Sequence, residues 1–291
     1  MGMTGHYRMG PIQVGATPTT IGGITDVGVG QGVQVFREPA SGQIGAQVQA
    51  VTAIQPTGSF TTQSVEAALT ACGSLGSSLF TNPLILYGTK IDQHGAIAAS
   101  GHYSWTLRGG LLYPVSLSCP HRGNAALSYN ATIAYDGTNA PIVASGAATL
   151  PATITNKLWT LSAASIGGVG ATDVQNVQID FGLQVAGEAA DSDVYDTRLS
   201  INAVTPRVTI ETNDPSWFTT LGLGGTDITD GTITLRNRED RGDFSEDTMT
   251  LTFSGVAYVT DPYRASGQST GRASVVVDVE YDNTNAPFAL S

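Results

Sequence analysis

The stretch YDGTNAPIVAS, from Tyr135 to Ser145, decides how this chain is organised, because it returns at Tyr281 to Ser291 as YDNTNAPFALS. Seven of the eleven positions are identical at an offset of 146 in a chain of 291 residues. A repeat this long indicates two copies of one domain, not a solenoid of short repeats. We expect both stretches to form a closing turn, built on Tyr135, Asp136, Asn139 and Pro141 in the first copy and Tyr281, Asp282, Asn285 and Pro287 in the second.

Shorter matches keep the same order in both halves. TDV at 25–27 returns at 172–174, AIQPTGSFTT from Ala53 parallels AVTPRVTIET from Ala203, and GLLYPV from Gly110 aligns with GVAYVT from Gly255. These blocks predict an N-terminal arm over residues 1–21, a first domain over 22–147 and a second domain over 148–291. On composition alone, the arm reads equally well as a frayed terminus.

Both halves are dominated by alternating polar and apolar residues rich in Val, Ile, Thr and Tyr, as in VQVFR, RVTIET and RASVVVDVEYD. This is the pattern of half-buried strands. One short helix is expected in each half, at about 63–72 and 214–221, with Ser64 or Thr62 as the first cap and Gly73 after the end. The predicted fold class is mainly β: two tandem copies of a β-sandwich or partly open barrel, each with one short α-helix.

The net charge of −11 is unevenly distributed. Residues 1–145 hold five Lys/Arg and five Asp/Glu, whereas residues 146–291 hold eight and nineteen. Such a surface repels phosphate and argues against tight nucleic-acid binding. It either keeps the protein soluble or forms a wall past which DNA slides. We find no run of 18 apolar residues and no leader pattern, so we expect no membrane span and no secretion.

Catalytic motifs are absent from the sequence. All four histidines (His6, His94, His102 and His121) lie in the first half, so a histidine site cannot be common to both copies. Cys72 and Cys119 are read as small buried hydrophobic residues. We therefore predict no enzyme, and no catalytic, cofactor or metal site.

Three local patterns can each be interpreted as a functional site or as ordinary structure. His102, Tyr103 and Trp105 suggest a sugar-stacking site or, more simply, cross-strand aromatic packing. The segment 239–247, EDRGDFSED, reads as an integrin-type or calcium loop or as a solvated hairpin loop. The pairs Asp191/Asp193 and Asp227/Asp230 suit a carboxylate hydrolase or solvated turns, and we favour the second reading.

The order of elements resembles a known family. TDVGVGQGVQVF, a hairpin loop REPASGQIGAQ, the return AVTAIQPTGSF, a helix and a closing strand ending in IAYDGTNAP follow one another as in the tail tube proteins of long-tailed bacteriophages. The likeness is to members with a tandemly duplicated tube domain. It implies a structural virion protein, made in the host cytoplasm, that forms stacked homotrimeric, pseudo-hexameric rings in the tail. It also implies passage of double-stranded DNA without specific binding.

The resemblance further implies partners and contact sites. The partners are other copies of the chain, a tape-measure protein, and tail terminator and tip proteins. Both helices would face outward, an acidic lumen would face the DNA, and residues 1–21 would be a docking arm. Loops at 37–47 and 186–196 would stack rings through Arg37, Glu38, Pro39, Gln43, Glu188, Asp191 and Asp193. The alternative is another phage structural or surface protein with duplicated β-sandwich domains: a decoration protein, a distal tail component or an adhesin.

Overall fold

The computed structural model describes residues 6–39, 46–92, 94–152, 154, 157–170, 173–190, 193–214, 216–221, 225–238, 244–265 and 271–291. The chain is mainly β, as predicted, and its strands form large antiparallel sheets. The helices of this described part are α1 (Val65–Cys72) and α2 (Ser216–Leu221), close to the two predicted positions. Within the same residues, no helix is long and apolar enough to cross a membrane.

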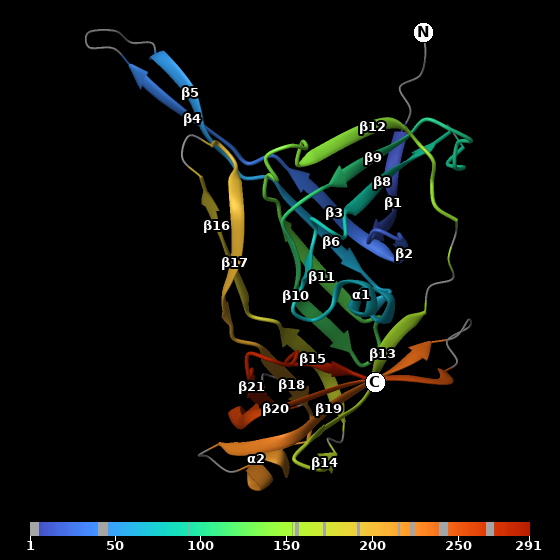
Figure 1. Cartoon of the computed structure of the whole chain (residues 1–291). Coiled ribbons are helices and arrows are strands. Elements are labelled where there is room, and N and C mark those ends of the chain that lie inside the picture. The colour runs from blue at the N-terminus through green and yellow to red at the C-terminus, as the bar shows by residue number, and fades with distance from the viewer. Residues whose placement is uncertain are drawn as a thin grey trace.

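A five-stranded sheet in the first half has the order β12-β9-β8-β1-β2 (Figure 1). Its strands are β1 (His6–Val14), β2 (Thr19–Ile21), β8 (Leu84–Ile91), β9 (His102–Leu107) and β12 (Ile142–Ala148).

Strand β1 corrects the expectation of an arm over residues 1–21. It lies between β8 and β2, with Ile12 and Val14 buried, so residues 6–21 belong to the fold. The sequence hid this strand because Gly10 and Pro11 interrupt its alternation. They fall where the β1–β8 register shifts between Met9 and Ile12, and such a bulge tolerates a proline that cannot donate to a ladder. Residues 1–5 lie outside the described residues.

The large sheet runs through both halves in the order β14-β13-β19-β20-β21-β18-β15-β10-β11-β6-β3, with β22 on β20 and β7 on β10. Its first-half strands are β3 (Ile24–Gly30), β6 (Thr57–Thr62), β7 (Ser77–Ser78), β10 (Leu111–Pro120) and β11 (Ala126–Thr132). Its second-half strands are β13 (Leu158–Ile166), β14 (Val169–Gly170), β15 (Val174–Asp180), β18 (Arg207–Thr212), β19 (Thr226–Arg238), β20 (Phe244–Arg264), β21 (Arg272–Val279) and β22 (Ala289–Leu290).

The first-half core lies between the five-stranded sheet and strands β3, β6, β11 and β10. A Cβ added at Gly58 of β6 would lie 2.5 Å from the Leu107 side chain of β9, so these layers meet face to face. Helix α1 closes this core by burying Val65, Ala68, Leu69 and Cys72. It is held by Tyr129 of β11, whose hydroxyl donates to the carbonyl oxygen of Gly73 at 3.0 Å.

The chain passes from one layer to the other at a corner in each half. In the first half this corner joins two separate strands, β9 and β10, whereas in the second half the single strand β20 spans it. Strand β20 pairs with β19 over most of its length and with β21 beyond Gly255, where the backbone has a φ of +158°. In the first half, the turn between the separate strands β9 and β10 contains Gly110, with a φ of +100°. A Cβ at Gly110 or Gly255 would lie 2.1 Å from a backbone oxygen, so glycine is required at both corners.

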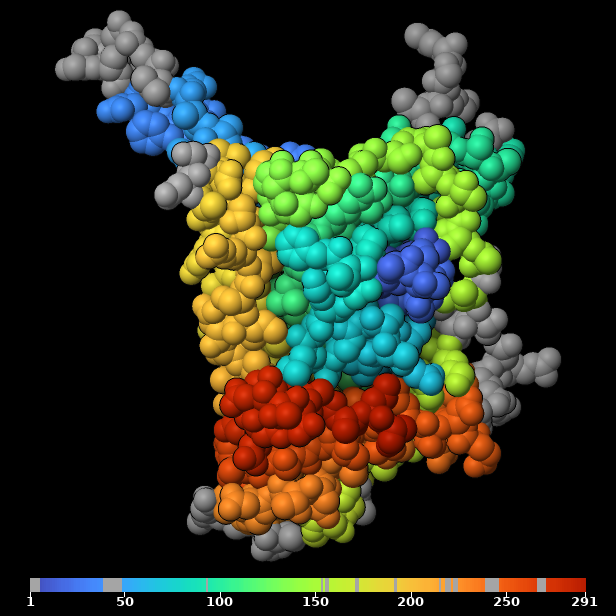
Figure 2. Space-filling view, in the orientation of Figure 1, coloured from blue at the N-terminus to red at the C-terminus, as the bar shows by residue number. Residues whose placement is uncertain are grey.

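Two β-hairpins leave this body. Hairpin β4–β5 (Val33–Pro39 and Ala46–Ile54) follows β3, and hairpin β16–β17 (Leu183–Ala189 and Asp196–Val204) follows β15. In Figures 1 and 2, β16–β17 lies along the side of the first half, whereas β4–β5 projects away from the body.

Candidate assembly site

Eight consecutive strands, β3-β6-β11-β10-β15-β18-β21-β20, present one broad exposed face. Side chains alternate across each strand, so Phe60 and Ile210 point into the core while their neighbours point to solvent. In the first half the outward side chains are mostly hydroxyls. Thr61 and Ser128, for example, share a hydrogen bond of 2.9 Å across β6 and β11.

In the second half the same face is charged. Arg207 contacts Asp278 at 2.8 Å, Arg272 contacts Glu211 at 3.6 Å, and Asp180 stands opposite Arg207 in the ladder. The hydrogen bond from Arg207 to Asp278 raises the pKa of the guanidinium. These pairs are about half exposed, so each stabilises the fold only weakly. Asp261 and Arg264 of β20 stand opposite Ser274 and Arg272 on the same face. Four acids against three arginines leave this part of the face weakly acidic.

The two halves join through the β10–β15 ladder. Leu117 pairs with Ile179 and Cys119 with Val177, and all four side chains are fully buried. At the two ends of the ladder, Phe181 donates its N–H to Val115 at 3.0 Å and His121 donates to Gln175 at 2.9 Å. Burial raises the pKa of the Cys119 thiol, and raises that of Cys72 to about 12, so the reading of both as buried apolar residues is confirmed.

The far ends of the eight-strand run resemble the two strands of this junction. The β3–β6 register matches that of β15–β18 at an offset of 150, and both shift at the same place, between Ile24 and Asp26 and between Val174 and Asn176. The β20–β21 register matches β10–β11 as far as Asp261 and Ser116, with shifts at Val259/Asp261 and Pro114/Ser116, and β20 then has a second shift, between Asp261 and Arg264, that β10 lacks. Strand β3 is therefore the counterpart of β15, and the end of β20 is the counterpart of β10. Because β15 and β10 pair with each other inside the chain, the open edges of β3 and β20 are of matching types.

Both edges are open in the described residues. Strand β3 pairs with β6 on one side, and β20 pairs with β21 beyond residue 258. Val29 on β3 is 38% exposed and Tyr263 on β20 is 67% exposed. An unpaired edge is a template for another strand.

The expected closing turns are present in both halves. Asp136 Oδ1 accepts the N–H groups of Thr138 and Asn139 at 2.8 and 2.7 Å, and the Asn139 amide donates to Oδ2 at 2.8 Å. Asp282 is bonded in the same way by Thr284 and Asn285. The Asn139 side-chain bond, followed by the two backbone bonds, lowers the pKa of Asp136 to about 2. Bonds from Asn285 and Thr284 lower the pKa of Asp282.

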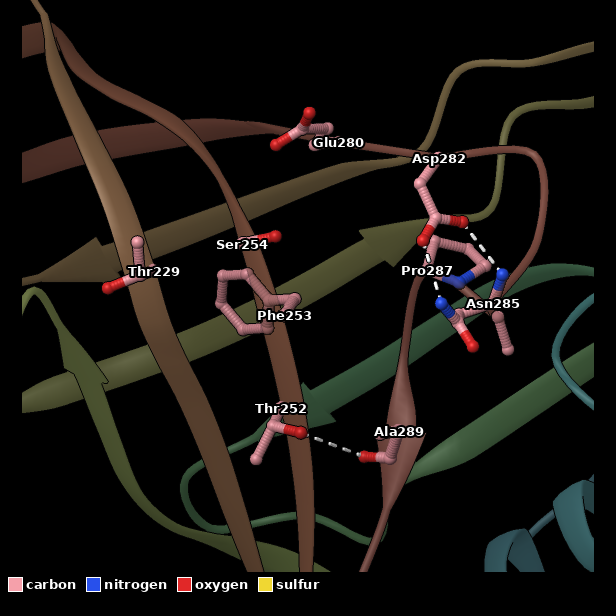
Figure 3. A pocket seen from close by; sticks show the side chains of 10 residues that line it. Thr229, Thr252, Phe253, Ser254, Glu280, Asp282, Asn285, Pro287 and Ala289 are labelled. Carbon is pink, nitrogen blue, oxygen red and sulfur yellow. Dashed lines mark hydrogen bonds between the residues drawn. The ribbon is translucent and has the colours of Figure 1, made fainter.

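A hollow of about 470 Å³ lies beside the second turn (Figure 3). Glu280 and Asp282 supply the carboxylates of its lining. Both oxygens of Asp282 accept hydrogen bonds from the turn, and its lowered pKa makes it a poor base. The geometry gives Asp282 a structural role in the turn.

The expected ring-stacking residues lie on the two hairpins. Arg37, Glu38 and Pro39 end β4, Glu188 lies on β16, and Asp193 follows that strand, whereas Gln43 and Asp191 lie outside the described residues. Arg37, Glu38, Glu188 and Asp193 are exposed.

The remaining candidates fall elsewhere. Tyr103 stacks on Trp105 at 6.2 Å and meets Tyr7 edge-on at 5.0 Å, which supports cross-strand packing. Asp227 and Asp230 are exposed on β19. In the 239–247 segment, residues 239–243 lie outside the described residues, and Phe244 of β20 pairs with Arg238 of β19. No cluster of three or more His, Cys, Asp or Glu suited to a metal occurs in the residues that the structure describes.

Comparison with known proteins finds no matching family and no matching curated protein. Function is therefore inferred from the sheet edges. The sequence predicts pairing of strand edges between chains but not which strands provide them. The matched blocks AIQPTGSFTT and AVTPRVTIET mark β6 and β18, but strand partners depend on long-range pairing that no local pattern encodes.

Proposed function

We propose that this chain is two tandem copies of one β-sandwich domain and that it assembles head to tail into the rings of a phage tail tube. The agreement in strand order supports the duplication. In the first half, one layer is β12-β9-β8-β1-β2 and the other is β10-β11-β6-β3. In the second half, β22-β20-β19-β13-β14 and β20-β21-β18-β15 follow the same orders, with β20 serving both layers.

The observation that carries the assembly proposal is the pair of complementary open edges. The chain already joins one copy to the other through β10 and β15, and β20 and β3 carry the matching registers at its two ends. Pairing β20 of one chain with β3 of the next would repeat the internal junction. By that register Asp261 would stand opposite Gly30, and Arg264 opposite Gly28. Arg264 would then be a diagonal neighbour of Asp26, with opposite charge.

A heterologous contact of this kind closes into a ring or continues as a helix. We propose a ring of three chains, since six copies of the domain match the pseudo-hexameric rings of the family that the sequence resembles. Three chains of eight strands would form a closed barrel of 24 strands, in which neither β3 nor the end of β20 is left as an open edge. The exposed hydroxyl and weakly acidic face would line the lumen.

In this proposal the face that lines the lumen has no catalytic role. Hydroxyl groups and paired charges give DNA phosphates no cationic surface to bind, so DNA passes without a fixed site. Rings would stack around a tape-measure protein, and terminator and tip proteins would cap the tube in the virion.

A proline on the β3 edge tests this proposal. The Phe181 N–H donates to β10, and the carbonyl oxygen of Gln175 accepts from His121. In an antiparallel pair, every second residue of a strand directs its N–H and C=O to the same partner. The N–H groups of Val177 and Ile179, which lie between Gln175 and Phe181, therefore face β10. At the 150-residue offset, the N–H groups of Val27 and Val29 face the open edge. Val29→Pro should leave the β6 ladder intact but abolish association of chains in sedimentation velocity. Val29→Ala, which keeps the N–H, should associate as the natural chain does. Equal association of both variants would refute edge pairing.

A further inference from the structure

Hairpin β16–β17 is seated on the first half of its own chain. The Ile54 N–H donates to the carbonyl oxygen of Val194 at 2.6 Å, and the Tyr135 N–H donates to that of Asp196 at 2.8 Å. Between these bonds, the rings of Tyr135 and Tyr195 lie 5.4 Å apart. The seat is thus the corner where β5 meets β6, together with the tyrosine that opens the first closing turn. Figure 2 shows the hairpin lying against this half.

Hairpin β4–β5 corresponds to it at an offset of 150, and its described residues, 33–39 and 46–54, have no such seat in their own chain. The registers agree pair by pair: Val33 with Ile54 and Leu183 with Val204 at the base, and shifts at Gln34/Val35 and Gln184/Val185. Burial differs. Leu183, Val185 and Ala186 are half-buried, whereas the corresponding Val33, Val35 and Phe36 are 46–47% exposed. On the paired strand the contrast is small, because Val51 is 46% exposed and its counterpart Ile201 is 38% exposed. We call Val33, Val35, Phe36 and Val51 the hairpin stripe.

An equivalent corner exists on the second half. Ile54, Pro56, Ile133 and Tyr135 correspond to Val204, Pro206, Val279 and Tyr281. The corner bond is the same in both halves: Ile133 donates to Pro56 at 3.0 Å, and Val279 to Pro206 at 2.9 Å. A hollow of about 630 Å³ lies at the second corner, lined by Val204, Pro206 and Val279 together with Asp180, Arg207 and Asp278 of the exposed face. Among the described residues, no segment of the chain occupies this corner as Val194–Asp196 occupies the first.

We propose that the hairpin stripe of one chain docks on the Val204–Tyr281 corner of a second copy. The occupant and the seat are both drawn from a contact that the chain already makes. The same neighbour is predicted by edge pairing. Hairpin β16–β17 follows β15 and lies on the first half, which is the half that β15 joins through β10. By the same rule, hairpin β4–β5 follows β3 and would lie on the second half of the neighbouring chain, which β3 would join through β20. This inference rests on the head-to-tail assembly proposed above and adds a second contact to it.

The docking contact lies between neighbours in one ring. Residues 37–47 and 186–196 were expected to stack one ring on another. In the seated hairpin, the residues that bond to the first half are Val194 and Asp196, which lie in and beside its turn. The contact within one chain therefore already uses the tip of the hairpin.

Substitutions on the two partners test the docking. Val35→Asp places a charge in the hairpin stripe, and Tyr281→Ala removes the ring at the seat. Each should raise the concentration at which full-length chains associate, by about 10-fold or more, as loss of a central apolar contact does. Gln49→Asp adds the same charge at an exposed polar position of the same hairpin and should change little. Tyr135→Ala alters the internal seat and should lower thermal stability more than association.

A mixing experiment separates docking from other causes of lost association. Val35→Asp keeps an intact seat and Tyr281→Ala keeps an intact hairpin. An equimolar mixture should therefore form mixed dimers at a concentration where neither variant alone associates.

The results distinguish the two proposals. If Val35→Asp associates as the natural chain does while Val29→Pro remains monomeric, edge pairing stands and hairpin docking is wrong. If the natural chain itself remains monomeric at every concentration, both are wrong. Docking is also wrong if the equimolar mixture associates no more than Val35→Asp or Tyr281→Ala does alone.

Discussion

At the scale of single residues, the closing turn explains why both halves end with the same sequence. Asp136 and Asp282 each accept two backbone N–H groups and one amide from the asparagine three residues on. Gly137 and Asn283 follow them with φ of +82° and +61°, a conformation that glycine and asparagine tolerate best. The proline of each repeat is buried beyond the turn. These requirements fix Asp, Asn and Pro at the spacing seen in the sequence.

The lowered pKa of Asp136 predicts a pH effect on stability. Because the carboxyl ionises more readily in the folded chain, the turn stabilises the fold above about pH 4, the unfolded value. That contribution disappears as the pH falls through about 2. The difference in urea midpoint between the natural chain and Asp136→Ala should therefore be largest near neutrality and shrink in acid. A difference that stays constant with pH, or one matched by the exposed charge control Asp193→Asn, would contradict this role.

Gly182, which lies between β15 and β16, predicts a steric effect. Its φ is +59°, and an added Cβ would lie 2.1 Å from the carbonyl oxygen of Thr205. Gly182→Ala should cost about 3 kcal/mol or more in free energy of unfolding, because strain and overlap act together. Gly137→Ala meets no atom within 4 Å and should cost only about 1 to 2 kcal/mol, from strain alone. If chemical denaturation gives the same loss of unfolding free energy for Gly182→Ala and Gly137→Ala, the chain shifts to remove the overlap between the added Cβ and Thr205, and the steric prediction is wrong.

At the scale of elements, the β10–β15 ladder holds the two halves together. Its inward residues are fully buried, so the halves share one continuous core. This is also the internal example on which the proposed contact between chains is based.

The two cysteines report on separate elements. Cys119 lies in the β10–β15 ladder and Cys72 ends α1, and burial raises the pKa of both thiols. For Cys72, a pKa of about 12 in place of 9.0 lowers the thiolate fraction on the order of 1,000-fold. Labelling by a disulfide reagent at pH 8 should thus require opening of the fold. Cys119→Ala would isolate the signal from Cys72. Rapid labelling of both thiols in the native protein would show that the ladder or α1 opens easily.

Local patterns predicted individual elements better than their partners. RVTIET became β18 as expected, and α1 begins after Ser64 and ends before Gly73, as the predicted caps require. The Ser64 side chain makes no cap bond to the helix, and Thr62 Oγ1 accepts the Ser64 N–H instead. Strand β1 was missed because its bulge contains Gly and Pro. The strands at the open edges could not be predicted because pairing such as that of β10 with β15 joins residues that are far apart in sequence, where no periodicity applies.

At the scale of the whole molecule, the uneven charge is only partly explained. The exposed face of the second half carries four acids against three arginines, which is a small part of the excess: Asp180, Glu211, Asp261 and Asp278 against Arg207, Arg264 and Arg272. Other acids lie on β19 and on hairpin β16–β17, away from that face. The charge of the proposed lumen is therefore mild, and the acidic excess belongs largely to other surfaces.

This charge predicts the behaviour of the protein toward DNA. With a net charge of −11 and a face of hydroxyls and paired charges, the chain should not retain double-stranded DNA in a filter-binding assay even at low salt. Asp180→Lys with Asp278→Lys should introduce weak, salt-sensitive retention if the face is accessible. Tight retention by the natural protein would contradict a passive lumen.

The central claim is assembly of this chain into closed rings by pairing of its two open edges. The most direct test is electron microscopy of the purified full-length protein at high concentration, with the symmetry of the particles measured. We predict hollow rings with three-fold symmetry and six lobes, stacking end to end into tubes. Compact single chains at every concentration and salt, or open filaments without a closed ring, would contradict it.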